Sequence, residues 1–269
     1  MINTTPSTTF AAPPAWTLLG MEPMRAVLEY ASMRVMDKAA LPRGDGHPVV
    51  LFPGLAADRR STAPLQDFCE SLGYTAYDWG RGFNTGPQGD VDVWIDELAQ
   101  HIRELTRTHE QSMSLVGWSL GGIYAREVAK KLPGRVRQII TIGTPFAGTP
   151  EQTHVTWAYR LVNGQTPWVD EALMARLRTA PDVPNTSIFS RSDGVVAWQA
   201  CIQEPTGDHT ENIEVDGSHC GLGWNKDVLS IIADRLRQPE NAWQRHARTM
   251  RPLSTLLAPQ ASLPKGEPT

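Results

Sequence analysis

The sequence predicts an α/β domain built on a mostly parallel sheet. Short apolar runs, most of them rich in β-branched residues, alternate with segments of helical periodicity between residues 49 and 236. At 113–116, 123–131 and 136–142 a strand, a helix and a strand follow one another closely, which is the spacing of a βαβ unit with parallel strands. The 269 residues suffice for one large domain with its own core.

The N-terminal part predicts a flexible segment followed by a helix. Residues 1–22 begin with a stretch rich in Ser, Thr, Pro and Ala, which we expect to be loose. Pro23 is a residue that suits the first turn of a helix. A helix that covers an edge of the sheet is the favoured interpretation, and a peripheral membrane helix is the alternative. The expected helix carries an apolar face formed by Met24, Val27, Leu28, Ala31 and Val35.

The first half of the sheet follows. We expect strands at 49–52 and 75–79, with a helix around 63–72 between them. The loop 80–90 contains four glycines and one proline, so it should be long and irregular. A helix is predicted at 91–108.

The second half resumes the alternation after an interruption. Residues 150–184 break the rhythm and carry Trp157 and Trp168, so we expect a small helical cap there, with a helix at 169–178. Strands at 186–190 and 212–215 and a helix around 228–236 complete a single α/β domain at 23–238. Residues 239–269 form a C-terminal extension that we expect to be partly disordered.

A candidate nucleophile lies where the central strand turns into the helix, in the segment G-W-S-L-G. So sharp a reversal forces Ser119 into a strained conformation and leaves no room for side chains at Gly117 and Gly121. The strain should hold the Ser119 hydroxyl exposed at the tip of the turn, with a helix N-terminus behind it.

Two further loops follow strands and carry the remaining candidates. Asp193 follows the strand at 186–190, and His219 follows the strand at 212–215. The order Ser119, Asp193, His219 is that of hydrolases with a nucleophile elbow, with His219 as base and Asp193 as the orienting acid. Asp216 is the rival acid, but it lies three residues from His219 on the same loop and suits a turn better.

The developing oxyanion also needs backbone donors. The N–H of Leu120, directly after the nucleophile, is one candidate. The other is the N–H of Leu55, presented by Pro53 and Gly54 at the end of the first strong strand.

Composition excludes several other functions. The net charge of −4 and a pI near 6.0 offer no footprint for nucleic acid. No apolar run reaches membrane-spanning length. The start of the chain does not resemble a signal peptide, so we expect a cytoplasmic protein, with export left open. The three cysteines lack zinc-ligand spacing, and we expect no metal.

Five segments together resemble the α/β-hydrolase superfamily, and within it bacterial lipases and carboxylesterases. The resemblance covers roughly residues 48–237 and implies the same triad, the same oxyanion donors and no cofactor. It also implies a sheet of about six strands, because the two early strands of larger members are missing. Many lipases have His where this chain has Pro53 and Trp118. The segments are H-P-V-V-L-F-P-G-L, G-W-S-L-G-G, I-G-T-P-F-A-G, S-D-G-V-V and G-S-H-C-G-L-G.

The expected activity is therefore hydrolysis of a small-molecule ester or lipid by a serine hydrolase through an acyl-enzyme. An acyltransferase using the same triad and a non-catalytic binding module of this fold are the alternatives. Nine tryptophans suggest an apolar cleft, and we expect Trp118, Trp157 and Trp168 to contact the substrate.

The loops of acid and base each carry a cysteine, Cys201 and Cys220. If Asp193 touches His219, a disulfide between these cysteines is sterically plausible, and some bacterial lipases tie the two loops together in a similar way. Two reduced thiols packing beside the site are the alternative.

Overall fold

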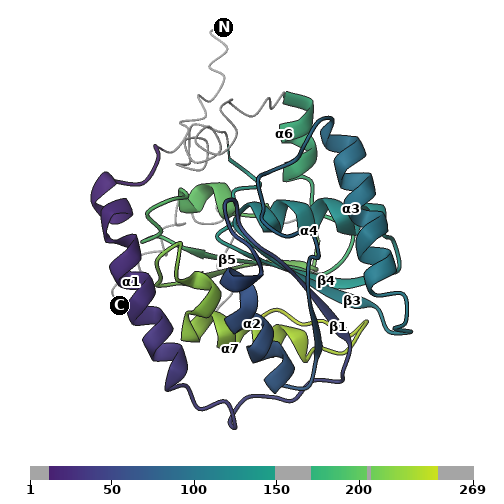
Figure 1. Cartoon of the computed structure of the whole chain (residues 1–269), viewed down its shortest axis with the longest axis horizontal. Coiled ribbons are helices and arrows are strands. Elements are labelled where there is room, and N and C mark those ends of the chain that lie inside the picture. Colours follow the sequence, from purple (N-terminus) through teal and green to yellow (C-terminus); the bar gives the residue numbers. More distant parts are fainter. Residues whose placement is uncertain (1–11, 149–170, 205–206, 248–269) are drawn as a thin grey trace, which may run out of the picture.

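The structure is a computed structural model that describes residues 12–148, 171–204 and 207–247 (Figure 1). Its centre is a sheet of six strands, all parallel, in the order β2-β1-β3-β4-β5-β6. This confirms the predicted fold class, and it places the carboxyl ends of all strands at one edge. The strands are β1 (Pro48–Phe52), β2 (Thr75–Asp78), β3 (Met113–Trp118), β4 (Val136–Ile142), β5 (Asn185–Ser190) and β6 (Thr210–Val215).

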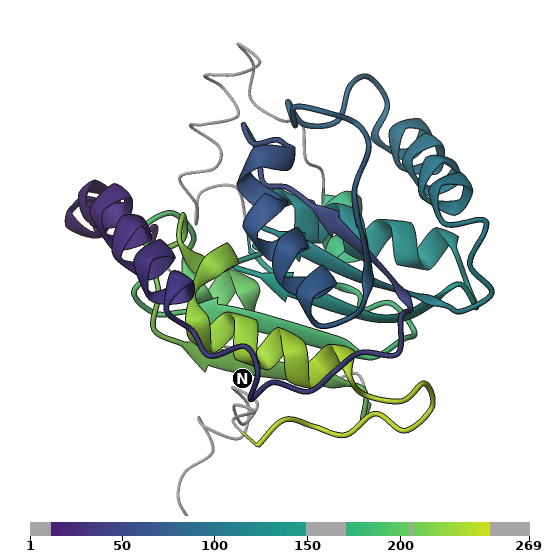
Figure 2. The same cartoon turned by 60° about the horizontal axis from the view of Figure 1, so that its bottom comes forward.

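Helices cover both faces of the sheet (Figures 1 and 2). Because side chains alternate along a strand, Val49 and Leu51 face one layer, while Val50 and Phe52 face the other. The first layer holds α2 (Arg59–Ser71) and α7 (Lys226–Leu236), and the second holds α3 (Val91–Leu105) and α4 (Leu120–Lys131). The remaining elements are α1 (Trp16–Arg34), α6 (Glu171–Arg178) and the short 3-10 helices η2 (Trp198–Cys201) and η3 (Leu222–Trp224).

The first helix departs from the prediction. α1 begins at Trp16, so Pro23 lies inside the helix and residues 16–22 are not part of a loose segment. Proline removes a single hydrogen bond of the helix, and contacts with the loops after β5 and β6 hold this helix in place. Apart from this helix, the observed element boundaries lie within a few residues of those predicted.

The expected cap lies mostly outside the described residues, because its residues 150–170 fall in a gap and only its C-terminal part is seen. That part includes α6, which the Arg126 guanidinium fixes to α4 by donating to the backbone oxygens of Leu177, Arg178 and Thr179 at 3.2–3.4 Å. Carbonyl groups at a helix C-terminus lack partners within the helix, so a buried cation there satisfies them. Helix α6 is thus attached to the helix that follows Ser119.

The first residues of the expected C-terminal extension pack on the domain. Arg235 of α7 donates to the Gln244 backbone oxygen at 2.6 Å, and the His246 N–H donates to Glu211 at 2.7 Å. None of the helices in the described ranges is long and apolar enough to span a bilayer.

Candidate active site

Ser119 occupies the turn between β3 and α4. Its backbone has φ 54° and ψ −125°, a region that residues other than glycine rarely adopt. The turn is held by a hydrogen bond from the Ser119 N–H to the Ile142 carbonyl oxygen (2.8 Å) and another from the Gly122 N–H to the Ser119 carbonyl oxygen (3.0 Å). The predicted backbone strain at Ser119 is present.

The two glycines that flank Ser119 are required by close packing. A Cβ atom on Gly117 would lie 2.3 Å from the Gly122 Cα, and one on Gly121 would lie 2.3 Å from the Phe52 carbonyl oxygen. Both positions would collide with backbone, which cannot move aside as a side chain can. Any larger residue at either position would therefore open the turn.

The three polar side chains singled out in the sequence form one hydrogen-bonded chain. The distance from Ser119 Oγ to His219 Nε2 is 3.0 Å, and that from His219 Nδ1 to Asp193 Oδ2 is 2.7 Å. Ser119, Asp193 and His219 are 6%, 3% and 7% exposed. The Ser119 hydroxyl is thus less accessible than expected, because His219 and the loop at Gly54 pack against it.

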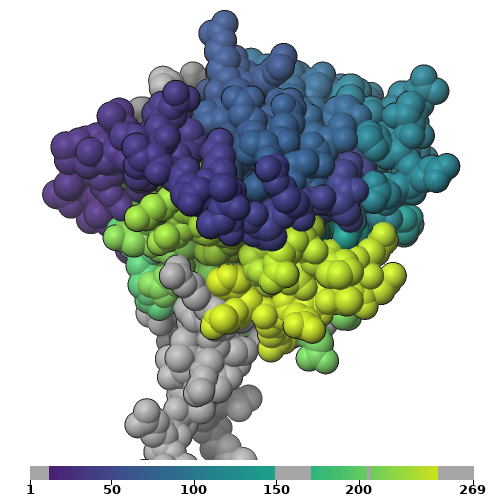
Figure 3. Space-filling view, turned by 90° about the horizontal axis from the view of Figure 1, so that it is seen from below, coloured from purple at the N-terminus to yellow at the C-terminus, as the bar shows by residue number. Residues whose placement is uncertain are grey.

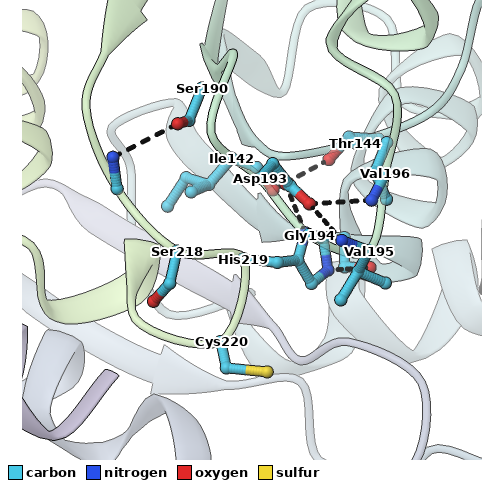
Figure 4. A network of polar contacts seen from close by, with 12 residues as sticks. Ile142, Thr144, Ser190, Asp193, Gly194, Val195, Val196, Ser218, His219 and Cys220 are labelled. Carbon is cyan, nitrogen blue, oxygen red and sulfur yellow. Dashed lines mark hydrogen bonds and ion pairs between the residues drawn. The ribbon is translucent and has the colours of Figure 1, made fainter. Parts of the chain in front are cut away.

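Asp193 is oriented by the loop that carries it (Figure 4). Its Oδ1 accepts hydrogen bonds from the Val195 N–H (2.8 Å) and the Val196 N–H (2.7 Å), which leaves Oδ2 for His219. The rival Asp216 does not reach the base. Its side chain is 91% exposed and pairs with Arg25 at 3.7 Å.

The neighbours of His219 favour its protonated form. Burial lowers the pKa of this imidazole, but the Asp193 charge, the Asp193 hydrogen bond and the Glu22 charge raise it more strongly, and the pKa lies above 6.5. An imidazole so placed can take a proton from Ser119 Oγ and hold it.

The loop after β1 lies beside Ser119, as expected. A Cβ atom on Gly54 would be 3.9 Å from Ser119 Oγ, so the next residue, Leu55, presents its backbone close to the hydroxyl. The N–H groups of Leu55 and Leu120 donate no hydrogen bond to any other residue that the structure describes. Both donors are therefore available to a negatively charged oxygen.

Asn84 fixes this loop, and the sequence analysis missed it. Its Nδ2 donates to the Pro53 carbonyl oxygen (2.9 Å), and its backbone oxygen accepts from the Ala56 N–H (2.8 Å). These bonds hold the peptide groups on either side of the one that carries the Leu55 N–H. Ala56 has φ 57°, so the loop is strained here as well. The only signal in the sequence was an Asn in a loop of four glycines; the structure shows that its side chain is buried.

Trp118 does not have the expected role. Its indole N–H donates to the His219 carbonyl oxygen at 3.1 Å, and its ring packs edge-on against Trp224, with centroids 5.3 Å apart. The ring is buried in the core cluster that includes Leu222 and against which Trp224 packs, so Trp118 supports the loop that carries His219. The other two expected contacts, Trp157 and Trp168, lie outside the described residues.

The expected disulfide is not formed. Cys201 and Cys220 are both free thiols, as is Cys69. Cys201 is buried among Phe189, Val196 and their neighbours, whereas Cys220 is exposed and points away from Asp193 (Figure 4). The contact between acid and base therefore does not bring the two sulfur atoms together.

A second Asp–His–Ser chain lies at the amino ends of the strands. His47 bonds to Asp45 through Nδ1 and to Ser114 Oγ through Nε2, the latter at 2.7 Å. His47 and Ser114 are both 0% exposed, so no substrate can reach this hydroxyl. We interpret the chain as a structural network that ties β1 to β3.

Helix α1 contributes groups that the sequence analysis did not assign. The carboxylate of Glu22 accepts backbone hydrogen bonds from the loops of acid and base, and that of Glu29 accepts from Ser218. The signal in the sequence was a polar stripe at helical spacing, formed by Glu22, Arg25, Glu29 and Ser32, on a helix that is otherwise largely apolar. Across the described ranges, no three His, Cys, Asp or Glu side chains are grouped as the ligands of a metal would be.

Comparison with known proteins gives the following. A family model described as the Alpha/beta hydrolase family matches residues 49–264. Pimeloyl-acyl-carrier-protein methyl ester esterase of Shewanella woodyi is 29% identical over 102 residues, which cover 38% of this chain and 37% of that protein. The mouse serine hydrolase BPHL is 26% identical over 136 residues, or 48% and 46% of the two chains. The chain thus spans less than half the length of these curated relatives.

Solved structures show the same fold. Lipase B of Aspergillus fumigatus superimposes with a TM-score of 0.56 at 20% identity, covering 76% of this chain and 56% of that one. The mature lipase BlEst2 of Bacillus licheniformis superimposes with a TM-score of 0.56 at 16% identity, covering 74% and 95%.

Proposed function

Because this chain belongs to the alpha/beta hydrolase family, we propose that it is a serine hydrolase of carboxylic esters. The observation that carries the proposal is the continuous hydrogen-bonded chain from Asp193 through His219 to Ser119, with Ser119 on a strained turn beside two backbone donors. The esterases and lipases among the similar proteins support the same substrate class. A binding module would not need all three groups in this arrangement.

The first half of the reaction acylates the enzyme. His219 Nε2 takes the proton of Ser119 as Oγ attacks the ester carbonyl carbon. The carbonyl oxygen becomes an oxyanion and accepts hydrogen bonds from the N–H groups of Leu55 and Leu120. His219 then donates the proton to the alcohol oxygen, the C–O bond breaks, and the acyl group remains on Ser119.

The second half releases the acid. His219 removes a proton from a water molecule, whose oxygen attacks the acyl carbonyl carbon and forms a second oxyanion in the same place. When this intermediate collapses, the proton on His219 returns to Ser119 Oγ and the carboxylic acid leaves. Asp193 stays ionised throughout and keeps the proton of Nδ1 in place, so that Nε2 is free to act.

The test compares the wild-type protein with Ser119→Ala on p-nitrophenyl esters of graded acyl length. We expect the variant to lose activity by several orders of magnitude and to keep its circular dichroism spectrum and melting temperature. A fluorophosphonate probe should label the wild-type protein on Ser119 and fail to label the variant. His209→Ala, which changes an exposed histidine outside the site, serves as the control and should retain activity. Full activity in folded Ser119→Ala would refute the proposal.

A further inference from the structure

The loops of the acid and the base are joined by one carboxylate from a distant helix. Glu22 of α1 is 2% exposed. Its Oε1 accepts hydrogen bonds from the Gly194 N–H (2.8 Å) and the His219 N–H (3.0 Å), and its Oε2 accepts from the Cys220 N–H (2.8 Å). Glu22 thus bonds to the residue after the acid, to the base itself and to the residue after the base.

These loops need such a link because the sheet does not supply one. The ladder between β5 and β6 ends with the pair Ser190 and Val215, before Asp193 and His219 are reached. Beyond that pair the two loops are linked directly by the hydroxyl groups of Ser190 and Ser192, which bond to Asp216 and Gly217. These bonds lie before Asp193 and His219, which must meet at 2.7 Å.

Helix α1 is built to approach the two loops closely (Figures 2 and 3). A Cβ atom on Gly194 would lie 2.6 Å from the Leu18 carbonyl carbon, so only glycine lets the acid loop touch the helix backbone. Two more side chains of the same helix face bind the same loops. Arg25 donates to the Ser192 backbone oxygen (2.5 Å), and Glu29 accepts from the Ser218 N–H (2.7 Å).

We propose that Glu22 is a positioning residue for the reaction, which clamps the acid loop to the base loop and places its negative charge beside His219. This inference rests on the proposed function for its kinetic consequences. An ionised carboxyl group only accepts hydrogen bonds, and all three partners of Glu22 are N–H donors, which suits a charged clamp. Glu22 does not touch the reacting atoms and acts only through the placement and charge of its neighbours.

The charged groups near Glu22 determine which pKa values a substitution of Glu22 would change. The pKa of His219 is lowered by burial, raised most by Asp193 and raised further by Glu22. Cys220 stays a neutral thiol, because partial burial and the Glu22 charge raise its pKa to about 12. On α1 itself, Arg25 faces Ser192 and Asp216, and Glu29 faces Ser218. Glu29 lies on the same helix face, but its carboxylate bonds to Ser218 and not to His219.

Two substitutions separate the two roles of Glu22. Glu22→Gln keeps an oxygen for Gly194 and His219, but it removes the charge and the bond from the Cys220 N–H, because an amide NH₂ group cannot accept it. Glu22→Asp keeps the charge but is too short to reach both loops. Glu29→Gln is the matched control, because it makes the same chemical change at a carboxylate that binds the base loop through Ser218. The readouts are the pKa of His219 from histidine NMR, assigned with His219→Gln, and the pH dependence of kcat/KM.

We expect Glu22→Gln to lower the pKa of His219 and to move the acidic limb of the kcat/KM profile to lower pH. We expect Glu22→Asp to leave this pKa near its wild-type value while kcat falls by roughly tenfold to a hundredfold, since small displacements of catalytic groups cost this much. Glu29→Gln should not move the pKa.

An unchanged or raised His219 pKa in Glu22→Gln would overturn the inference, and so would an equal shift in Glu29→Gln. If Glu22→Gln did not fold, retention of wild-type kcat by Glu22→Asp would overturn it instead. The NMR titration needs no turnover. It therefore decides the effect of Glu22 on His219 even if the wild-type protein hydrolyses no ester, a result that would refute only the proposed function.

Discussion

Replacing Asp193 with Asn tests how His219 is held, because the surroundings of Asp193 fix which way the new amide must face. Oδ1 of Asp193 receives two backbone N–H groups, from Val195 and Val196. An amide must therefore keep its oxygen there and turn its NH₂ group toward His219 Nδ1. That nitrogen would then have to accept, and the ring proton would move to Nε2, which faces Ser119 Oγ at 3.0 Å. A ring in this tautomer cannot take the serine proton.

The expected loss of kcat follows from the free energy needed to turn the new amide around. Turning the amide over would restore the productive tautomer but would take away the oxygen that accepts from the Val195 and Val196 N–H groups. Losing this acceptor costs about 1–3 kcal/mol for each N–H group, or about 2–6 kcal/mol for both. At about 1.4 kcal/mol per factor of ten, kcat should fall by between thirtyfold and 10⁴-fold, and loss of a triad acid elsewhere reaches the upper end of this range.

The assay is steady-state hydrolysis of a p-nitrophenyl ester by Asp193→Asn at a pH above the wild-type pKa of His219, with circular dichroism to verify folding. Asp216→Asn is the control. Its exposed carboxylate makes a surface ion pair that contributes little, so we expect a rate within about twofold of wild type. A rate for Asp193→Asn within tenfold of wild type would refute the reasoning, as would a larger loss in Asp216→Asn.

Two more predictions concern residues that the sequence did not single out. Asn84→Ala should lower kcat by about 100-fold, which is the typical effect of losing one oxyanion donor, and should leave KM nearly unchanged. The reason is that Pro53 loses the hydrogen bond that orients the Leu55 N–H. A wild-type kcat in steady-state assays would contradict this role of Asn84. Burial lowers the pKa of His47 below 6.5, even though Asp45 raises it. Protonation of His47 therefore destabilises the fold, and the free energy of unfolding should fall as pH drops below about 7.5, where the imidazole of the unfolded chain begins to bind its proton. Urea unfolding of His47→Gln should show a weaker pH dependence than the wild-type protein, and an equal dependence would contradict the role of His47.

The fold could be predicted from the sequence because its signals are local. Buried parallel strands are short apolar runs, and the turn at Ser119 needs glycines at fixed offsets, so both can be found without any long-range information. The meeting of Asp193 and His219 was predictable as well, since each follows a strand of a parallel sheet and all carboxyl ends share one edge.

What the sequence could not reveal depends on tertiary contacts. Helix α1 continues through Pro23 toward its N-terminus because its partners lie far along the chain, where local propensity has no influence. Trp118 looks like a substrate contact until the ring is seen to lie against Trp224. The directions of the Cys201 and Cys220 side chains depend on how two loops bend, which neighbouring residues do not specify.

The clamp at Glu22 also has a consequence for the order in which the protein folds. Its hydrogen bonds join residues that are 172, 197 and 198 positions apart in the chain. Contacts between residues so far apart in the chain form late in folding, because closing the long segment between them costs entropy that the contacts offset only once that segment is ordered. During synthesis α1 emerges before any strand of the sheet. Its carboxylate has no donor until the loop after β5 has followed, and it lacks two of its three donors until the loop after β6 has followed. On refolding, the proposed activity would then return with the docking of this helix, and not with the formation of the sheet.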